Sequence, residues 1–290
     1  MPTLVGGNSW LLYLPVAGVK VLCDPWLIGD LTFWDLPMLY TGRKSVDGRG
    51  SEGGAAVLGS AALELAATAD VVLLSQGWED HAHRPTLRAM PKDIPVVASP
   101  AAADVARDLG FEDVTALRAG ARKTIAGTSG GVGAVVRATA GALVGPPWSE
   151  REAGFIVSEQ TDEGACCGMR VYYEPHCSYD TKSVVDGVRV VGGRVDVAIT
   201  PVRSVDVAGF PLVSGGAAAV ELLEVLGCPA VVLPLRNGEL AQEGLSAPLL
   251  GSDGTTAEEF GRLLAARPRL KFTRLVMPEP GVAIQVHVDA

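Results

Sequence analysis

The chain has 290 residues and a formal net charge of −9, with 48% hydrophobic and 20% charged residues. Its length is enough to bury a full core without disulfides or a structural metal. The negative charge argues against a nucleic-acid partner, because binding a phosphate backbone needs a concentrated basic face. No apolar run reaches the ~18–20 residues that a membrane helix needs.

The sequence contains five cysteines, at positions 23, 166, 167, 177 and 228. Their odd number and irregular spacing do not form a disulfide framework, and no C-x-x-C pair indicates a structural zinc site. No signal peptide precedes the first strand pattern. We therefore expect a soluble protein of a reducing compartment, either the cytoplasm or an organelle such as a plastid.

Hydrophobic patterning predicts a chain in which strands and helices alternate. It opens with two short strands over 9–14 and 19–23, separated by a turn. The other predicted strands cover 69–74, 95–98, several segments within 124–157, 170–174, 195–201, 230–235 and 282–288, and the predicted helices cover 60–68, 84–90, 100–109, 215–226 and 255–266. The alternation favours layered α/β structure. No Pro- or Ser-rich linker divides the chain, so we expect one domain over residues 1–290.

A polar turn directly after one predicted buried strand carries the most informative pattern. Residues 73–83 read Leu-Leu-Ser-Gln-Gly-Trp-Glu-Asp-His-Ala-His, so a carboxylate and two imidazoles follow the end of the strand. The turn resembles the metal-binding turn of the metallo-β-lactamase fold, whose usual form is His-x-His-x-Asp-His. Gln76 and Trp78 stand at the first two histidine positions, whereas Asp80 and His81 keep theirs.

The resemblance extends from Ser9 to about Val288 and includes an opening strand–turn–strand that ends in Asp24-Pro25-Trp26. It is closest to the branch of the metallo-β-lactamase fold superfamily that includes ascorbate-phosphate lactonases and related hydrolases. The fold that it implies is α/β (α+β), a four-layer αββα sandwich. Because one scaffold hosts many chemistries, the fold alone does not establish the activity.

The resemblance also implies which residues would hold a metal ion. In the family, the Asp and His of the polar turn bind the second metal, and an Asp on a later strand bridges both metals. The segment Tyr-Tyr-Glu-Pro-His-Cys at 172–177 places His176 at that bridging position. Asp80, His81 and His176 would then form a mononuclear site for one divalent ion, with zinc favoured. His83 is a further candidate ligand, with an exposed turn residue as the alternative.

Structural roles are an open alternative for the same side chains, and in that case the protein holds no metal. Asp80 would cap the helix over 84–90, His81 would pack in the turn, and His176 would bond to the backbone at a strand end.

The usual first-site ligands of the family are missing together, which implies a degenerate site with at most one metal ion. Their places are taken by Gln76, Trp78, the segment around Ala142 and Leu143, and Arg236.

Arg236 is the main candidate for substrate binding. A guanidinium stays charged, is no metal ligand, and binds carboxylate or phosphate in a forked geometry. We therefore expect a small anionic substrate, with an ion pair between Arg236 and Asp80 or Glu174 as the metal-free alternative. Further candidate substrate-binding residues are Asn237, Gln76 and Trp148.

Glu174 lies two residues before His176, so both side chains would point to one face of a strand. It is the candidate general base or the residue that orients the imidazole, and Asp80 shares the catalytic role. The first hypothesis is thus a divergent hydrolase that cleaves an ester, lactone or phosphodiester with an anionic group. The alternative is a catalytically inactive relative that acts as a binding or assembly protein. A third option is a metal-free hydrolase that uses His176 with Cys177 or Glu174.

Overall fold

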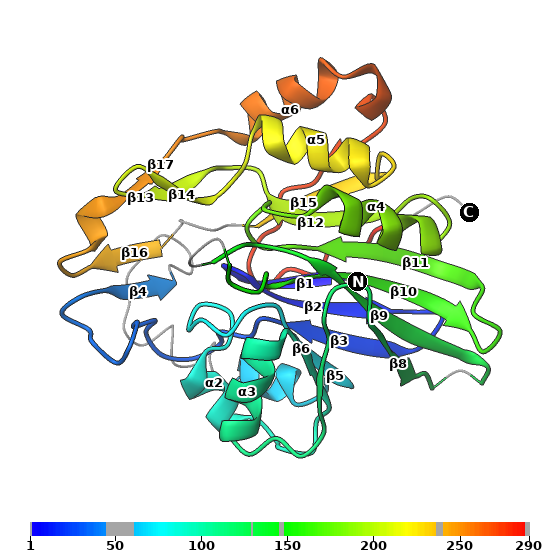
Figure 1. The fold of residues 1–290 in the computed structure, drawn as a ribbon, viewed down its shortest axis with the longest axis horizontal. Helices are drawn as coiled ribbons and strands as arrows, with labels where there is room; N and C mark the ends of the chain where they lie inside the picture. Colours follow the sequence, from blue (N-terminus) through cyan, green and yellow to red (C-terminus); the bar gives the residue numbers. More distant parts are fainter. Residues whose placement is uncertain (1, 45–60, 129, 145–147, 236–239, 288–290) are drawn as a thin grey trace.

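Four layers make up the part of the chain that this computed structural model describes, residues 2–44, 61–128, 130–144, 148–235 and 240–287. Two β-sheets face each other in the middle, and helices cover the outer face of each sheet (Figure 1). This arrangement confirms the predicted four-layer αββα sandwich. That residues 1–290 form one domain stays a prediction.

The first sheet has six strands, in the order β1 (Pro2–Gly6), β2 (Ser9–Leu14), β3 (Val19–Cys23), β5 (Val71–Leu74), β6 (Val96–Ala98) and β7 (Val114–Ala116). The last four strands run parallel. All four residues of β5 are buried, as expected for a parallel strand that is covered on both faces. The helices α2 (Arg84–Ala89) and α3 (Pro100–Asp108) lie on the outer face of this sheet.

The second sheet has seven strands, in the order β18 (Arg274–Leu275), β15 (Val231–Leu235), β12 (Val197–Pro201), β11 (Cys166–Tyr173), β10 (Ala153–Thr161), β9 (Val132–Ala140) and β8 (Arg122–Ala126). Strands β11, β12, β15 and β18 are parallel, whereas β8 to β11 form an antiparallel meander. Its outer face is covered by α4 (Thr181–Val190), α5 (Ala217–Val225) and α6 (Ala257–Ala265).

Three groups of buried side chains hold these layers together. The first lies between the sheets and contains Trp10 and Tyr173, whose rings meet edge to face at 5.1 Å. The second joins the second sheet to its helices and contains Tyr172 and Phe260, and the third joins the first sheet to α2 and α3 around Leu87. Because side chains alternate along β11, the neighbours Tyr172 and Tyr173 belong to different cores.

The carboxyl ends of parallel strands from both sheets meet at one edge of the sandwich. Asp24 follows β3, Ser75 follows β5, and Glu174 follows β11. The hydroxyl of Tyr173, the last residue of β11, donates to the Asp24 carboxylate at 2.5 Å, so the two sheets are in direct contact there. In open parallel sheets, this is the edge where ligands bind.

A smaller lobe, which we call the cap, covers this edge and consists of residues 31–44, 205–213 and 240–252. It contains a two-stranded sheet of β4 (Thr41–Lys44) and β16 (Leu240–Glu243), and a three-stranded sheet of β13 (Val205–Val207), β14 (Phe210–Val213) and β17 (Leu250–Ser252). The cap lies at the left of Figure 1. Its segments are far apart in the sequence, and patterning along the chain did not predict it.

Two other features differ from the sequence expectations. Residues 282–287 form no strand, although Ile284 and Val286 pack against the core between the sheets. The alternating pattern there reflects the partial burial of every second side chain, and the backbone forms no strand. Helix α4 was not predicted, because Gly187 and several valines lower its helix propensity. Within the described ranges, no helix is long and apolar enough to cross a bilayer.

Candidate active site

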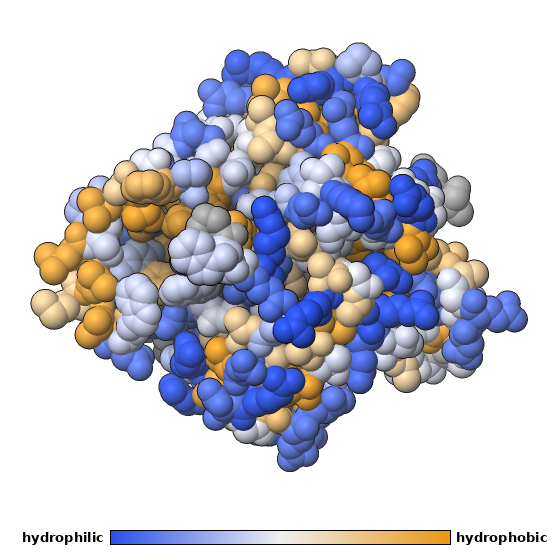
Figure 2. Space-filling model, in the orientation of Figure 1, coloured by the Kyte–Doolittle hydropathy of each residue, from blue (hydrophilic) through white to orange (hydrophobic). Residues whose placement is uncertain are grey.

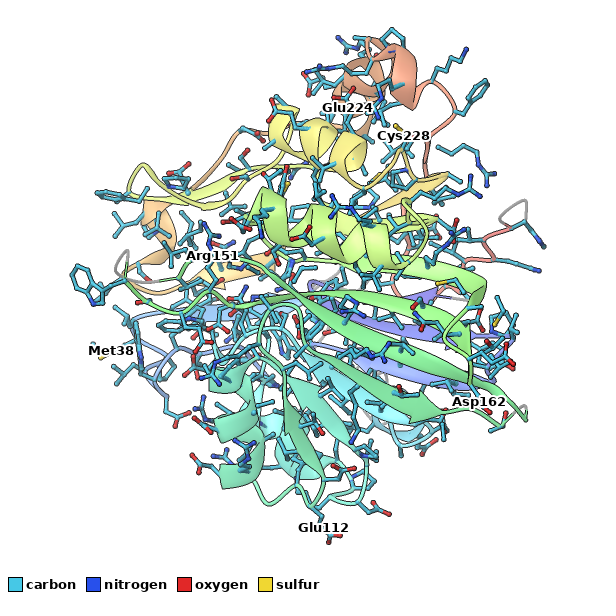
Figure 3. All side chains as sticks on the ribbon, turned by 45° about the vertical axis from the view of Figure 1, so that its right-hand side comes forward. Met38, Glu112, Arg151, Asp162, Glu224 and Cys228 are labelled. Atoms are coloured by element: carbon cyan, nitrogen blue, oxygen red, sulfur yellow. The ribbon has the colours of Figure 1, made fainter. Side chains whose placement is uncertain are left out.

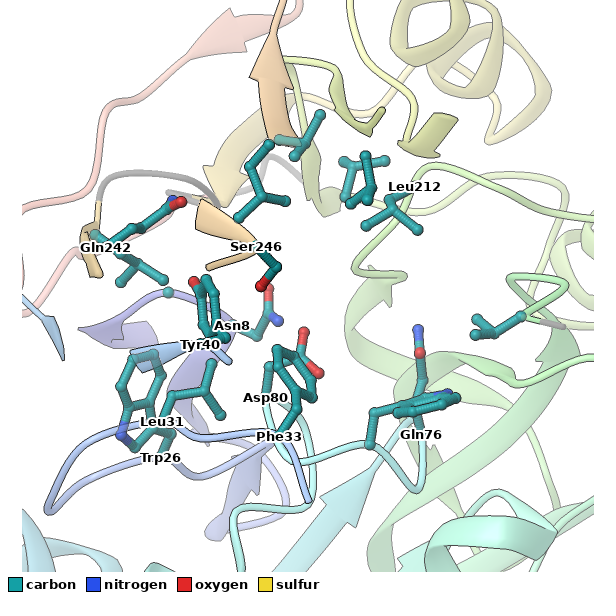
Figure 4. A pocket seen from close by; sticks show the side chains of 18 of the residues that line it. Asn8, Trp26, Leu31, Phe33, Tyr40, Gln76, Asp80, Leu212, Gln242 and Ser246 are labelled. Carbon is teal, nitrogen blue, oxygen red and sulfur yellow. The ribbon is translucent and has the colours of Figure 1, made fainter. Parts of the chain in front are cut away.

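A cavity of about 420 Å³ lies between the cap and the carboxyl ends of the strands (Figure 4). The body of the sandwich contributes Asp80 and His176 to its lining, and the cap contributes Leu31, Tyr40 and Leu240. Two of the three predicted metal ligands therefore face an accessible space that could admit a small molecule.

The structure brings together three residues that the sequence analysis grouped, Asp80, His81 and His176. The Nε2 atom of His81 lies 3.1 Å from Oδ2 of Asp80 and 3.3 Å from Nε2 of His176. One ligand atom from each residue lies within 4.8 Å of the other two. No other group of three or more His, Cys, Asp or Glu side chains within the described residues is arranged in this way.

Asp24 holds the His81 ring from the opposite side. Its Oδ2 accepts a hydrogen bond from Nδ1 of His81 at 2.8 Å, and both side chains are fully buried. The carboxylate also accepts from the backbone N–H of Ser75 at 2.7 Å, from the hydroxyl of Ser75 and from that of Tyr173. This contact keeps a proton on Nδ1, so Nε2 is the ring nitrogen that would bind a metal at Asp80 and His176 once it has lost its own proton.

The pKa values of the two imidazoles in this cluster are shifted in opposite directions. Burial by itself lowers the pKa of His81, but the carboxylates of Asp80 and Asp24 outweigh burial and raise that pKa to about 10. Burial, reinforced by the charge on His81, lowers the pKa of His176 to about 3. Without a metal, His81 is therefore protonated on both ring nitrogens and positively charged at neutral pH, whereas His176 is neutral.

The spacing of the donors fits a tetrahedral ion. Two ligand atoms that each lie 2.0–2.1 Å from one zinc ion in tetrahedral geometry are about 3.3 Å apart. The two Nε2 atoms match this separation, and the oxygen of Asp80 is close to it. A carboxylate with two imidazoles is also a donor set that divalent zinc accepts. The residues present therefore fit one ion.

Glu174 is buried and lies in the turn after β11. Its Oε2 accepts from the backbone N–H groups of His176, at 3.2 Å, and Ser178, at 3.0 Å. Burial raises its pKa to about 8, so the carboxyl is mostly protonated at pH 7. It is not among the described residues that line the cavity. These contacts favour a role for Glu174 in orienting His176, and they disfavour the role of general base.

His83 does not join the cluster. It caps the N-terminus of α2, with Nδ1 accepting from the backbone N–H of Thr86 and Nε2 lying 3.2 Å from the carbonyl oxygen of Asp30. Burial lowers its pKa to about 4. The helix cap is thus His83, and the alternative role of Asp80 as that cap was wrong.

The predicted substrate-binding residues have different outcomes. Gln76 lines the cavity and is 1% exposed, whereas Trp148 is 86% exposed and is not among the described lining residues. Arg236 and Asn237 lie outside the described residues. Trp78, which replaces a family histidine, lines the cavity and meets Trp34 edge to face at 6.2 Å.

Cys177 is a poor candidate for a nucleophile. Its side chain is buried, and burial and the neighbouring carboxyl of Glu174 raise the pKa of the thiol well above its ordinary value. A thiolate is the reactive form, so this position disfavours the metal-free option that paired it with His176.

Two site residues were missed by sequence reasoning, Asp24 and Asn8. Asp24 was taken only as the end of a strand, yet its carboxylate orients His81. Asn8 places its amide nitrogen 3.4 Å from His81, and its buried Oδ1 has no hydrogen-bond partner among the described residues. The Asp-Pro-Trp sequence was a usable signal for Asp24, because an acidic residue at the end of a parallel strand points at the ligand edge.

Comparisons with known proteins agree with this fold. The family model of the beta-lactamase superfamily domain matches residues 3–236. No curated protein matches the chain in sequence. An isothiocyanate hydrolase from Delia radicum gut bacteria has a similar solved structure, with a TM-score of 0.61 at 14% identity over 99% of each chain.

Two further solved structures are similar over nearly their whole length. A possible metal-dependent hydrolase from Veillonella parvula gives a TM-score of 0.63 at 14% identity, covering 98% of both chains. The metallo hydrolase Igni18 from Ignicoccus hospitalis gives 0.60 at 15% identity, covering 99% of this chain and 98% of its own. At these identities, the likeness describes the fold. Since the family model spans most of the sequence, the chain belongs to the beta-lactamase superfamily.

Proposed function

We propose that this protein is a metal-dependent hydrolase that holds one divalent ion, zinc in preference to others, on Asp80, His81 and His176. The observation that carries the proposal is the 3.3 Å separation of the two Nε2 atoms beside the Asp80 carboxylate. This spacing is compatible with three donors to one ion, and a catalytic zinc site has three protein ligands and an open position.

Each residue of the site has a definable task in such a reaction. Asp24 keeps Nε2 of His81 turned towards the other two donors. Glu174 fixes the backbone turn that carries His176, and Asp80 adds the negative charge of the ligand set. When bound, a divalent ion polarises an acyl or phosphoryl oxygen and lowers the pKa of water. The cavity next to Asp80 is where a scissile bond would lie.

The proposed reaction class is hydrolysis of an ester, a lactone or a phosphodiester. Membership of a superfamily with metallo-hydrolase neighbours supports hydrolysis in general. The anionic substrate group predicted from the sequence depends on Arg236, which lies outside the described residues, so that part stays a prediction.

Elemental analysis of the purified protein tests the metal site. We expect about one equivalent of zinc in the unaltered protein, loss of that zinc in Asp80→Ala, and its retention in Asp104→Ala, which removes an exposed carboxylate on α3. Hydrolysis of a panel of esters and lactones should follow the zinc content. A protein that binds no metal after reconstitution would refute the proposal.

A catalytically inactive relative that binds or assembles with other molecules is the second candidate. It is favoured by the closed hydrogen-bond network of the metal-free site, in which His81 contacts a carboxylate through each ring nitrogen. A protonated imidazole there replaces the charge of a metal ion. The same elemental analysis separates the two, since this candidate predicts zinc-free protein and no turnover.

A further inference from the structure

We infer that the cavity takes an uncharged, largely apolar substrate, and that the Gln76 amide recognises its one polar group. This inference rests on the proposed function and names the substrate class of the same site. It departs from the anionic substrate that the sequence suggested.

The described walls of the cavity are apolar apart from a few groups. Phe33, Trp34, Trp78 and Leu212 are among the side chains that line it. No Lys or Arg of the described ranges lines it, and the charged lining group is the Asp80 carboxylate. An anionic group lying against these apolar walls would be buried without a described Lys or Arg to pair with it, and such burial is costly.

Gln76 offers a neutral hydrogen-bonding group inside this apolar space. Its side chain is buried, and neither its Oε1 nor its Nε2 has a partner among the described residues. The labelled Gln76 and Asn8 side chains both point into the cavity (Figure 4). A buried amide without partners is rare in folded proteins, and a ligand group is one explanation for it.

The chemistry of the amide specifies the group that it can recognise. Its nitrogen donates and its oxygen accepts, and the group has no net charge. The carbonyl oxygen of an ester, lactone or amide would accept from Nε2 of Gln76. Such a carbonyl belongs to the reaction class proposed above, and the acyl chain would contact the aromatic wall of Trp34 and Trp78.

The apolar surface continues outward from the cavity onto the cap. Exposed apolar side chains gather on this side of the molecule, at the left of Figure 2. They include Met38, Leu245 and Phe210, which are 71%, 72% and 75% exposed. The backbone N–H of Leu245 donates to the carbonyl of Met38 at 3.1 Å, so these two lie side by side, and Met38 lies at the outer edge of the cap (Figure 3). A patch of this kind suits an apolar molecule approaching the cavity.

Turnover of two matched esters tests the substrate class in zinc-loaded protein. Phenyl hexanoate is neutral, whereas the monophenyl ester of adipic acid has almost the same size and ends in a carboxylate. We expect kcat/KM to be at least tenfold higher for the neutral ester. Equal values, or a preference for the carboxylate, would overturn the inference.

Binding measured without turnover separates this inference from the proposed function. Tryptophan fluorescence reports binding of 1-phenylhexan-2-one, which has a carbonyl and cannot be hydrolysed, and of the sulfonate 5-phenylpentane-1-sulfonate. Tighter binding of the ketone supports the inference even if no zinc is found and no ester is cleaved. Tighter binding of the sulfonate contradicts it, whatever the metal content.

Gln76→Met tests the role of the amide. Loss of one neutral hydrogen bond should weaken ketone binding by about 2- to 12-fold, while binding of hexylbenzene, which lacks the carbonyl, should not weaken. Gln160→Met is the matched control, because Gln160 is a buried glutamine on β10 that is not among the described lining residues. If Gln76→Met does not fold, Gln76→Asn shortens the same amide and should weaken the ketone selectively. Unchanged ketone binding, or equal loss for ketone and hydrocarbon, rejects recognition by Gln76.

Discussion

The buried carboxylate of Asp24 accepts a hydrogen bond from Nδ1 of His81 at 2.8 Å. Asp24 directly follows β3, and His81 lies in the polar turn after the neighbouring parallel strand β5. Asp24 adopts a positive φ of 40°, an uncommon conformation for a residue other than glycine, and four donated hydrogen bonds secure its side chain. The orientation of the central imidazole is therefore built into the connection between sheet and turn.

Replacing Asp24 by Asn should weaken metal binding and leave the fold intact. The amide is nearly the same size but lacks the charge that fixes the proton on Nδ1 of His81. Loss of such a partner typically costs 10- to 100-fold in metal affinity, so we expect a decrease of roughly that size. Competition with a chromophoric zinc chelator measures it.

The matched control is Asp196→Asn, which alters another buried carboxylate. Asp196 forms an ion pair with Arg170 at 2.9 Å, and neither residue belongs to the site cluster. This variant should lower the melting temperature without changing zinc affinity. Equal zinc affinity in both variants would show that Asp24 has no special role.

Zinc binding should release a proton from His81. The pKa of this imidazole is about 10 without metal, because its two carboxylate partners outweigh burial. Because the pKa of His81 is raised, protonation of His81 stabilises the metal-free folded state. This stabilisation is fully present at pH values below the pKa of ~6.5 in the unfolded chain, and it is lost as the pH rises through about 10. Zinc competes with the proton, so its affinity should rise roughly tenfold per pH unit between about pH 5 and pH 7, below the pKa of ~7 that zinc gives its bound water.

Calorimetric titration at pH 6, where zinc-bound water is still mostly protonated, counts that proton in buffers of different ionisation enthalpy. We expect about one proton per zinc ion in the unaltered protein and in His287→Gln, which changes an exposed imidazole near the end of the described chain. A titration that releases none would mean that His81 is neutral before the metal binds.

The stability of the protein should rise with pH because of Lys44. Its ammonium lies 4.7 Å from the centre of the Trp26 ring and 3.1 Å from the hydroxyl of Ser9, and burial lowers its pKa to about 7. The unfolded chain therefore binds more protons than the folded chain between pH 7 and about 10, and stability rises with pH over that window.

Lys44→Met should remove this dependence and raise stability at pH 7. Urea unfolding at pH 7, 8, 9 and 10 measures the slope, and Lys182→Met is the control because that side chain is exposed on α4. An unchanged slope in Lys44→Met would contradict the assignment.

Sequence reasoning was strongest where local patterns and topology coincide. The family resemblance grouped Asp80 and His81 with His176, and the ends of β5 and β11 bring these three side chains to the same edge. Asp24 and Asn8 were missed because their roles depend on pairing between strands, which no local pattern encodes. The cap was missed for the same reason, since β4 pairs with β16 across roughly two hundred residues.

Glu174 should act as a positioning residue. Glu174→Gln keeps an oxygen that can accept from the N–H groups of His176 and Ser178, whereas Glu174→Ala does not. We therefore expect zinc affinity and kcat to survive in the Gln variant and both to fall in the Ala variant. A general base would lose kcat in both variants while keeping zinc, and this pattern would restore that role to Glu174.

Gln76→Met should stabilise the metal-free protein even though it weakens the proposed substrate contact. The substitution removes two buried polar atoms that have no partner among the described residues, and each such atom costs ~1–3 kcal/mol. Gln160→Met should do the opposite, because Nε2 of Gln160 donates to the Ser158 hydroxyl at 2.8 Å. Thermal melts of the two variants thus compare the same substitution at two buried glutamines. A lower melting temperature in Gln76→Met would mean that its amide is already satisfied, and that the cavity does not keep it free for a ligand.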